Sequence, residues 1–287
     1  MKGIVLAGGT GSRLWPITKG ASKQLLPIYD KPLIHYPIAT LMLAGIKEIL
    51  IITTPEDSNA FRRLLGDGSD LGVQFRFEIQ DKPRGIGEAF LIAKEFIGDD
   101  EVALILGDNI FHGHGLGSQL SEMREIKGAV VFAYSVSDPE RYGVVEFSDT
   151  GKAISIEEKP ADPKSNFAIP GLYFYDNKVI EKSKNCLPSA RGEIEISDIN
   201  RMYLEEGNLQ VKILPRGTVW LDTGTIDSLN SASNYVRIIE ERQGSKISCL
   251  EEVAWRNKWI TNLRIEDLAK GYKGNEYGKY LLKLLKE

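Results

Sequence analysis

The first 106 residues alternate short apolar runs with helix-like segments, and this alternation constrains the fold more than any other feature. Residues 3–7, 48–53 and 102–106 form nearly uninterrupted apolar runs, which are typical of strands buried on both faces. Residues 34–44 and 58–65 between them predict helices. Because strands and helices in alternation build a mostly parallel sheet with helices on both faces, the sequence predicts a Rossmann-like α/β fold.

The rest of the chain predicts a mixed sheet and a short helical tail. Further strands are expected at 73–79, 129–136, 143–147, 153–157, 171–175, 209–214 and 218–221. Further helices are expected at 87–96, 178–185, 196–206 and 227–242. Short amphipathic helices follow at 250–257, 265–268 and 277–285. We therefore expect a main domain at 1–244, with a mostly parallel mixed sheet flanked by helices, and a small C-terminal helical segment at 245–287.

Composition excludes several classes of protein. The chain is 42% hydrophobic and carries a formal net charge of −4 at pH 7, so it lacks the basic footprint of a DNA- or RNA-binding protein. Cys186 and Cys249 lie far apart without a C-x-x-C pair, which argues against a zinc site and a disulfide scaffold. The N-terminal apolar run is too short for a signal peptide, and no run approaches the roughly 20 residues that span a bilayer. We expect a cytoplasmic protein without a membrane segment.

The sharpest local feature is a glycine loop at residues 6–14, directly after the first predicted strand. Three glycines in four positions allow backbone N–H groups to converge on an anion, and Arg13 adds a forked donor for phosphate oxygens. No G-K-[ST] closes the loop, so it is not a Walker A motif. Leu14 stands where a dinucleotide fingerprint needs its third glycine, which disfavours an NAD-dependent enzyme. A tight turn without a ligand is the alternative interpretation of this loop alone.

Longer motifs identify a family. The pattern G-G-x-G-[ST]-R-L-x-P begins at Gly8, S-K-Q-L-L-P follows at Ser22, and D-K-P begins at Asp30. Together these motifs resemble the opening of the sugar nucleotidylyltransferases. Further matching blocks are Q-D-K-P-R-G from Gln80, L-G-D-N from Leu106, Y-G-V-V from Tyr142, E-E-K-P from Glu157, P-K-S-N from Pro163, G-L-Y-F-Y from Gly171, R-G-E from Arg191 and W-L-D-T-G-T from Trp220. The blocks cover residues 3 to about 260 and are most similar to the family members that act on dTTP and glucose 1-phosphate.

The resemblance implies a specific reaction. A phosphate oxygen of glucose 1-phosphate attacks the α-phosphorus of dTTP, pyrophosphate leaves, and dTDP-glucose forms, which is the first step of dTDP-deoxysugar (rhamnose-type) synthesis. Phosphoryl-type transfer needs positioning and positive charge around the transferring group. A divalent metal held by one or two carboxylates should bridge the phosphates, and oxygen ligands favour Mg²⁺. Asp108, at the end of a predicted strand, and Asp222, at a second strand end, are the expected metal ligands.

The resemblance also assigns site residues. The expected catalytic residues are Arg13, Lys23, Asp108, Lys159, Arg191 and Asp222. The expected nucleotide-binding residues are Leu6, Gly8, Gly9, Gly11, Ser12, Arg13, Lys23, Gln24, Gln80, Pro83, Gly85 and Asp108. The expected sugar-phosphate-binding residues are Asn109, Gly143, Glu158, Lys159, Ile169, Tyr173 and Arg191. Without the family pattern, the two aspartates would be read as turn or cap residues and residues 157–159 as a solvated charge run.

Several alternatives stay open at this point. A pocket distinguishes thymine from uracil by only about 1–3 kcal/mol, so a uridylyltransferase or an enzyme for another hexose 1-phosphate is the first alternative. A non-catalytic nucleotide-sugar sensor on the same scaffold is the second. His112 and His114 are interpreted as part of an ordinary loop rather than a metal site, because no third ligand lies nearby. The resemblance further implies a homotetramer with a regulatory dTDP-sugar site near a subunit interface.

Overall fold

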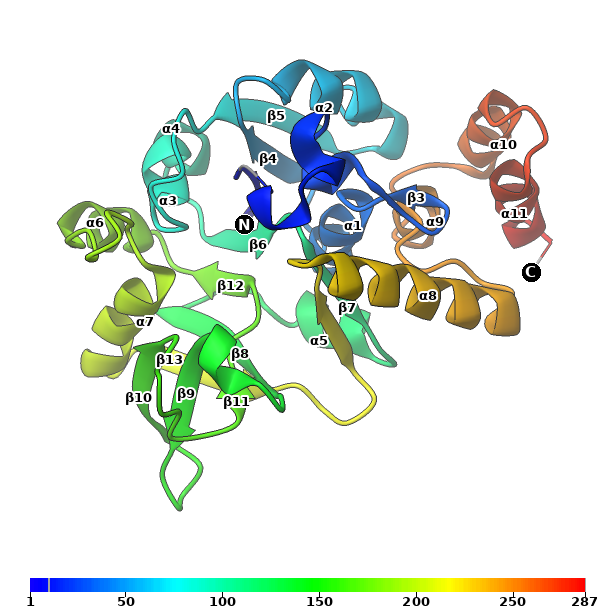
Figure 1. Cartoon of the computed structure of the whole chain (residues 1–287). Helices are drawn as coiled ribbons and strands as arrows, with labels where there is room; N and C mark the ends of the chain where they lie inside the picture. The colour runs from blue at the N-terminus through cyan, green and yellow to red at the C-terminus, as the bar shows by residue number, and fades with distance from the viewer. Residues whose placement is uncertain (10, 287) are drawn as a thin grey trace.

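A ten-stranded mixed sheet organises the fold in the computed structural model, which describes residues 1–9 and 11–286 (Figure 1). Thr10 of the glycine loop and Glu287 lie outside the described residues. The strands of this sheet are β1 (Lys2–Ala7), β4 (Glu48–Thr53), β5 (Gln74–Ile79), β6 (Val102–Leu106), β8 (Ala129–Ser135), β9 (Gly143–Phe147), β10 (Ala153–Glu158), β11 (Phe167–Ala168), β12 (Leu172–Tyr175) and β13 (Leu209–Ile213). Their order is β10-β9-β11-β8-β12-β6-β1-β4-β5, and β13 also pairs with β8. Two small sheets join β2 (Pro27–Ile28) to β3 (Lys31–Pro32) and β7 (Asn109–His112) to β14 (Val219–Asp222).

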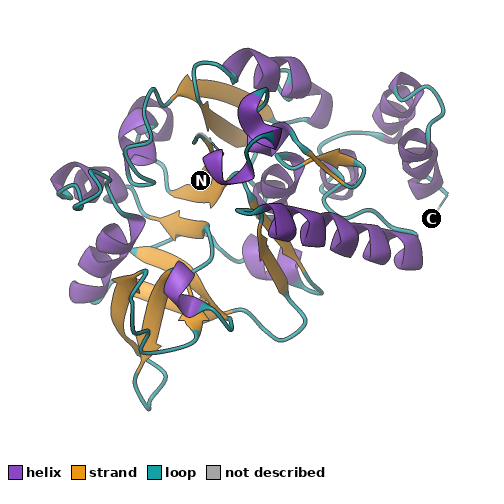
Figure 2. Ribbon diagram, in the orientation of Figure 1, coloured by secondary structure: helices purple, strands orange, loops and turns teal. Residues whose placement is uncertain are grey.

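Helices flank the sheet, as Figure 2 shows in purple. They are α1 (His35–Leu43), α2 (Ser58–Leu65), α3 (Glu88–Ile92), α4 (Lys94–Ile97), α5 (Leu116–Ser121), α6 (Val179–Asn185), α7 (Ile196–Glu205), α8 (Ile226–Gln243), α9 (Leu250–Arg256), α10 (Asn262–Gly271) and α11 (Glu276–Leu284). Within the described part of the chain, no helix has the length and apolar character needed to cross a membrane. The α/β fold with a flanked mixed sheet is therefore confirmed.

The two halves of the sheet differ in strand direction. Strands β5, β4, β1 and β6 run parallel, whereas β12 is antiparallel to both β6 and β8. In the parallel half, side chains such as Ile4, Val5 and Ile51 are fully buried, as the apolar runs predicted. Because parallel strands end at the same edge, the loops that follow β1 and β6 lie side by side at their carboxyl ends.

Some predicted elements need correction. The single helix expected at 87–96 is divided at Ala93, whose φ of −82° and ψ of 1° end α3 and precede α4. The helix expected at 265–268 is longer, since the Thr261 side chain accepts a hydrogen bond from Arg264 N at 3.3 Å and caps an earlier start of α10. His112, expected in a loop, ends strand β7, because β7 pairs with the distant strand β14.

The C-terminal helices pack on the main domain. Leu250 of α9 and Leu281 of α11 belong to the same hydrophobic core as Val5 of β1 and Ile38 of α1. In Figure 1, α10 and α11 lie at one end of the molecule, and α9 lies between them and α1. The residues from 245 onward therefore cover a face that the sheet and α1 leave apolar.

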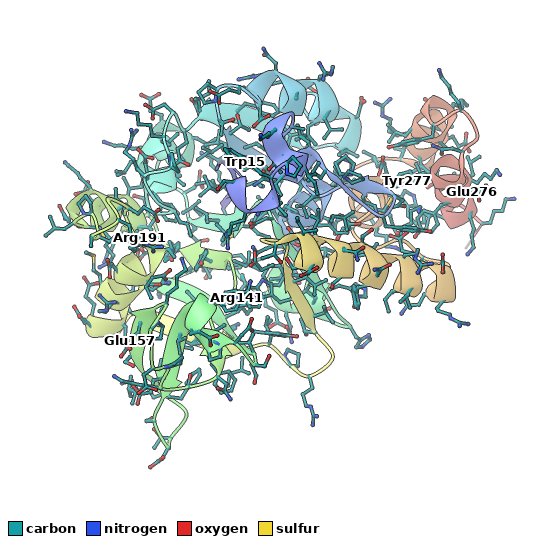
Figure 3. All side chains as sticks on the ribbon, in the orientation of Figure 1. Trp15, Arg141, Glu157, Arg191, Glu276 and Tyr277 are labelled. Atoms are coloured by element: carbon teal, nitrogen blue, oxygen red, sulfur yellow. The ribbon has the colours of Figure 1, made fainter. Side chains whose placement is uncertain are left out.

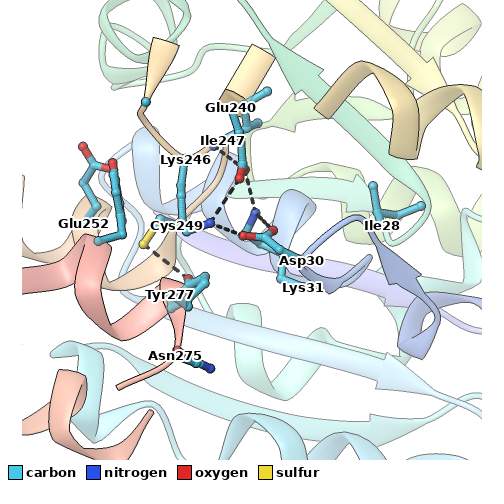
Figure 4. Close-up of polar contacts among 12 residues, drawn as sticks. Ile28, Asp30, Lys31, Glu240, Lys246, Ile247, Cys249, Glu252, Asn275 and Tyr277 are labelled. Atoms are coloured by element: carbon cyan, nitrogen blue, oxygen red, sulfur yellow. Dashed lines mark hydrogen bonds and ion pairs between the residues drawn. The ribbon is translucent and has the colours of Figure 1, made fainter. Parts of the chain in front are cut away.

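A group of charged side chains, of which Lys31 and Glu240 are buried, also ties this segment to the main domain (Figure 4). We call Asp30, Lys31, Glu240 and Lys246 the closed ion cluster. Lys31 Nζ lies 2.5 Å from Asp30 Oδ1 and 3.0 Å from Glu240 Oε1. Lys246 pairs with Asp30 and lies 3.2 Å from Glu240 Oε2. Backbone Ile247 N donates to Glu240 Oε1 at 2.9 Å, so α8, the β2–β3 hairpin and the start of the C-terminal segment meet at one satisfied cluster.

Candidate active site

The candidate site lies at the carboxyl ends of β1 and β6. Gly107 N, directly after β6, donates a hydrogen bond to Leu6 O at 2.9 Å and joins the two strand ends. A Cβ on Gly107 would lie 2.9 Å from Leu6 O, so a larger residue would separate them. The glycine loop and Asp108 therefore start from one rigid edge of the sheet.

The glycine loop curls over a pocket of about 360 Å³, which we call the nucleotide pocket. Gly11 has a φ of 58°, and Thr18 Oγ1 donates to its carbonyl oxygen at 2.7 Å, which holds the loop in its turned form. Lining residues that the sequence predicted are Leu6, Gly8, Gly9, Gly11, Ser12, Arg13, Lys23, Gln24, Pro83 and Asp108. The structure also adds Leu14, Ile86, Leu106 and Gly224 to the lining.

Gln80 and Gly85, the two remaining nucleotide-binding predictions, lie together at the edge of this pocket rather than in its lining. Gln80 Nε2 donates to Gly85 O at 3.3 Å and to Glu88 Oε2 at 2.8 Å. A Cβ on Gly8 would lie 2.9 Å from Gln80 Oε1, so the amide stands against the glycine loop. Buried Glu88, which the motif analysis did not single out, fixes the orientation of Gln80.

Asp108 and Asp222, which we call the acidic pair, come together although they stand 114 positions apart in the sequence. In the β14–β7 ladder, Asp222 is the partner of Asn109. Thr223 N and Thr223 Oγ1 both donate to Asp108 O, at 3.2 and 2.9 Å. Lys23 forms an ion pair with Asp108 Oδ2. The acidic pair therefore faces the glycine loop from the neighbouring strand ends.

The two carboxyl groups of the acidic pair have opposite pKa shifts. Burial would raise the pKa of Asp108, but the positive charge and hydrogen bond of Lys23 outweigh burial, and the net pKa is lowered. Burial, and next the negative charge of Asp108, raise the pKa of Asp222, although Lys23, Arg13 and Arg141 oppose that rise. A carboxylate that is hard to ionise beside an ionised one is the arrangement that a bound cation relieves.

A second pocket of about 470 Å³, the sugar pocket, adjoins the first and shares Arg13, Ile86, Leu106 and Asp108 with it. Its lining contains the predicted residues Asn109, Gly143, Glu158, Lys159, Ile169, Tyr173 and Asp222. Its lining also contains Arg141, Tyr142, Gly171, Ile196, Ser197, Asn200 and Trp220, which were not singled out as site residues. Trp220 and Tyr142 did belong to matching sequence blocks, so a signal for them was present.

Glu158 organises the charged wall of the sugar pocket. Ser197 Oγ donates to Glu158 Oε2 at 2.5 Å, and Lys159 Nζ lies 3.2 Å from Glu158 Oε1. Arg191 does not line the pocket, but its Nη2 lies 3.7 Å from Glu158 Oε1 and 2.8 Å from Glu195 Oε1. The φ of Lys159 is 44°, a left-handed conformation that costs about 1–3 kcal/mol in a residue other than glycine. This strain is consistent with a functional position for the Lys159 ammonium group.

His112, one of the two histidines considered above, contacts a tyrosine of α8. His112 Nδ1 lies 2.7 Å from Tyr235 Oη, and burial lowers the pKa of His112. Among the residues that the structure describes, no group of three or more His, Cys, Asp or Glu side chains could hold a metal ion by itself. The acidic pair offers two carboxylates, and Mg²⁺ is commonly bound through one or two carboxylates together with substrate phosphates and waters.

Comparisons with known proteins agree with this geometry. Residues 2–237 match the model of the nucleotidyl transferase family. A glucose-1-phosphate thymidylyltransferase of Neisseria meningitidis serogroup A is 57% identical over 288 aligned residues, which cover 100% of both chains. A Bacillus anthracis crystal structure assigned to the same enzyme, in complex with sucrose, aligns with a TM-score of 0.76 and 44% identity, covering 83% of this chain and 95% of that chain.

A more distant structure also aligns. UDP-glucose pyrophosphorylase in complex with UDP-glucose has a TM-score of 0.73 and 26% identity, covering 83% of this chain and 98% of that chain. The identity to the Neisseria thymidylyltransferase, 57%, is about twice the 26% identity to this pyrophosphorylase. The chain therefore belongs to the nucleotidyl transferase family and, within it, to the glucose-1-phosphate thymidylyltransferases.

Proposed function

We propose that this protein transfers a thymidylyl group from dTTP to glucose 1-phosphate, which yields dTDP-glucose and pyrophosphate. The observation that carries the proposal is the acidic pair, which lies where a glycine-loop pocket and a second polar pocket meet. A nucleotide in the first pocket and a sugar phosphate in the second would bring their phosphates together beside Arg13 and Asp108, which line both. Such positioning is the main requirement of phosphoryl-type transfer.

Nucleotidyltransferases of this family use a divalent metal. We propose that it is Mg²⁺ in this protein and that Asp108 and Asp222 hold it. The fit rests on two features: both ligands are hard carboxylate oxygens, and the charge of Asp108 already raises the pKa of Asp222. When bound, the ion would supply positive charge beside the phosphates and would offset the negative charge on the acidic pair.

Side chains of the chain itself supply the remaining roles in the proposal. Arg13 and Lys23 neutralise the triphosphate and the departing pyrophosphate. Lys159 and Arg191 hold the phosphate of the sugar substrate, whose oxygen is already ionised and needs no histidine base. Glu158 accepts hydrogen bonds from sugar hydroxyls.

The sites for base and sugar complete the assignment. Gln80 and the backbone near Gly85 read the thymine, and Gln24 approaches the deoxyribose. Asn109, Gly143, Ile169 and Tyr173 surround the glucose ring. The fixed orientation of Gln80 through Glu88 supports its proposed part in reading the base, because a held amide has a defined donor and acceptor.

A direct assay tests this function. Purified protein with Mg²⁺ and glucose 1-phosphate is supplied in turn with dTTP, UTP, CTP and ATP, and pyrophosphate release is measured. We expect the highest kcat/KM with dTTP, and UTP lower by about 10- to 200-fold, because one methyl group separates the bases. Preference for UTP would replace thymidylyl by uridylyl transfer, and inactivity with all four nucleotides would favour a non-catalytic sensor.

The finer assignments are proposals of the same kind. We propose a homotetramer, a regulatory dTDP-sugar site near a subunit interface, a cytoplasmic location, and use of the product in dTDP-deoxysugar synthesis. Their support is the similarity to the thymidylyltransferase branch. Light scattering would test the tetramer, and titration with dTDP-sugars during turnover would test feedback.

A further inference from the structure

Arg141 lines the sugar pocket and has no part in the roles above. It ends a short turn at Pro139–Arg141 directly before β9, and 40% of its side chain is exposed. Figure 3 shows Arg141 near the centre of the molecule, between the strand-rich half and the start of α8. A half-exposed guanidinium at a phosphate-transfer site is available to a ligand.

Two carboxylates lie on either side of the Arg141 guanidinium. Nη1 donates to Asp138 Oδ2 at 2.6 Å, which is a short charge-assisted hydrogen bond. Nη2 lies 3.7 Å from Asp222 Oδ2, beyond hydrogen-bond distance. Arg141 is therefore firmly attached to Asp138 and only loosely attached to the acidic pair.

An edge-on pair of aromatic rings packs beside the Arg141 guanidinium. The Arg141 group lies 5.2 Å from the centre of the Tyr142 ring, which in turn packs edge-on against Trp220 at 4.9 Å. Trp220 Nε1 donates to Asn109 Oδ1 at 2.6 Å, so the ring pair is fixed to the strand end that also carries Asp108. The position of Arg141 is thus defined relative to the acidic pair, as a positioned site group requires.

Because Nη2 makes no hydrogen bond to Asp222, it can instead donate one to a ligand. A divalent cation on the acidic pair would take over the charge of Asp222 and repel the guanidinium. Nη2 would then be free for a ligand in the sugar pocket, which Lys159 and Asp222 also line. A guanidinium suits this task because its planar fork can bind two phosphate oxygens at once.

We propose that Arg141 is a further catalytic cation, which contacts the phosphate of glucose 1-phosphate during its attack and rests against Asp222 when no metal is bound. The inference rests on the proposed function and adds a residue to it. In this proposal Arg141 contacts Asp222 in the free protein and the sugar phosphate in the substrate complex. Asp138 and Tyr142 hold the guanidinium in place in both states.

The chain offers a matched control for Arg141. Arg201 also pairs with an aspartate three positions earlier, Asp198, at 2.7 Å, and 42% of its side chain is exposed. It lines an outer groove beside β10 rather than either substrate pocket. Arg201→Gln therefore removes the same kind of surface ion pair without touching the site.

The first test is kinetic. We expect Arg141→Gln to lower kcat/KM for glucose 1-phosphate by about 100-fold, as does removal of one preorganised donor to a transition state, with KM for dTTP changed by less than about threefold. Arg141→Lys should recover part of this loss, since it keeps the charge and loses the fork. Arg201→Gln should stay within about twofold of the unmutated protein. Activity of Arg141→Gln within about threefold of the unmutated protein would overturn the proposal.

The second test measures metal binding without turnover. Mn²⁺ is titrated onto the substrate-free protein and followed by electron paramagnetic resonance. Because the guanidinium opposes a cation at Asp222, Arg141→Gln should bind Mn²⁺ about two- to tenfold more tightly while it turns over more slowly. Weaker Mn²⁺ binding together with slower turnover would indicate a damaged site and contradict the proposal. If the unmutated protein shows no turnover, the proposed function fails, whereas the titration still tests the Arg141–Asp222 contact.

Discussion

The closed ion cluster and the active site both combine lysines with carboxylates, but their surroundings differ. In the closed ion cluster, the side chains of Lys31 and Glu240 are only 2% and 5% exposed. Each charge there has opposite partners on the protein itself, and the two lysines balance the two acids. Burial would raise the pKa of Asp30, yet Lys31 and Lys246 outweigh it and the net pKa is lowered.

Asp222 of the acidic pair is held less closely than the carboxylates of the closed ion cluster. Lys23 forms an ion pair with Asp108, whereas Arg141 Nη2 lies 3.7 Å from Asp222 Oδ2. The pKa of Asp222 is raised by burial and by Asp108. The same residue types therefore stabilise the fold where each charge has close partners, and the looser contacts of Asp222 support the cation site proposed for the acidic pair.

The largest expected effect comes from removing the Asp222 carboxylate. Asp222→Asn should lower kcat on the order of 1000-fold, because the metal loses a ligand and the phosphates lose its charge. Stability should not fall, since the mutation removes a buried carboxylate whose raised pKa shows that its ionised form is unfavourable. Pyrophosphate release and urea unfolding measure the two effects.

The control for this variant is Asp227→Asn, an exposed aspartate in the first turn of α8. It should keep its turnover. Pyrophosphate release from Asp222→Asn close to that of the control would remove Asp222 from the mechanism.

A variant in the closed ion cluster should change stability instead of turnover. Glu240→Gln should lower the free energy of unfolding by about 3 kcal/mol, because it leaves buried Lys31 and partly buried Lys246 with one carboxylate between them. Turnover per folded molecule should be unchanged. The neighbour Glu241, whose side chain is 54% exposed, provides the control Glu241→Gln, with an expected change below about 0.5 kcal/mol. Equal stability of the two variants in urea would contradict the difference between the clusters.

A third variant tests whether the two pockets bind different substrates. Lys159→Ala should weaken the use of glucose 1-phosphate by about 10- to 100-fold and affect dTTP binding less, because a charged hydrogen-bond donor to the sugar phosphate is lost. Steady-state KM values and calorimetric titration of dTTP separate the two. Lys164→Ala, which removes an exposed lysine paired with Glu157 at 2.7 Å, is the control. A larger loss for dTTP than for the sugar would reverse the assignment.

The smallest effect concerns His35 at the start of α1, near the closed ion cluster. Burial, together with the charge of Lys31, lowers the pKa of His35 from 6.5 to about 4, although Glu251 and Asp30 oppose this. Its Nδ1 is buried without a hydrogen-bond partner among the described residues. The unfolded chain therefore binds a proton that the folded protein does not bind between these two pH values.

Because only the unfolded chain binds this proton, His35 makes the free energy of unfolding depend on pH. Its effect is absent above about pH 6.5, and below that it lowers the free energy of unfolding by about 1.4 kcal/mol per pH unit as the pH decreases toward about 4. Urea unfolding at several pH values should show this slope in the unmutated protein and in His114→Gln, whose histidine is exposed, and a smaller slope in His35→Gln. Equal slopes in all three proteins would exclude His35 as the source.

The sequence predicted much of the nucleotide pocket because that information is local. The glycine loop follows β1 directly, Asp108 follows β6, and both strands are apolar runs whose parallel pairing puts their ends at one edge. Ten of the twelve predicted nucleotide-binding residues line the pocket, and Gln80 and Gly85 lie at its edge. The role of each residue stays a prediction until a ligand is bound.

The contacts that complete the site depend on distant pairing. The ladder of β14 with β7 places Asp222 beside Asp108, and no periodicity in residues 109–112 predicts that strand. Arg141 was missed because an arginine in a short polar turn reads as a surface residue. In the closed ion cluster, Lys31 and Glu240 stand 209 positions apart. The sequence around either residue therefore does not predict that the two form a buried ion pair.

By itself, the sequence determined the α/β class and the turned form of the glycine loop, because hydrophobic periodicity and glycine conformations act over a few neighbouring residues. The family followed from the resemblance of the longer motifs. Only the tertiary structure decided which charges are balanced within the protein and which face a pocket. That choice depends on burial and on distances of a few ångströms between segments that are remote in the chain, and electrostatic energy changes steeply with both.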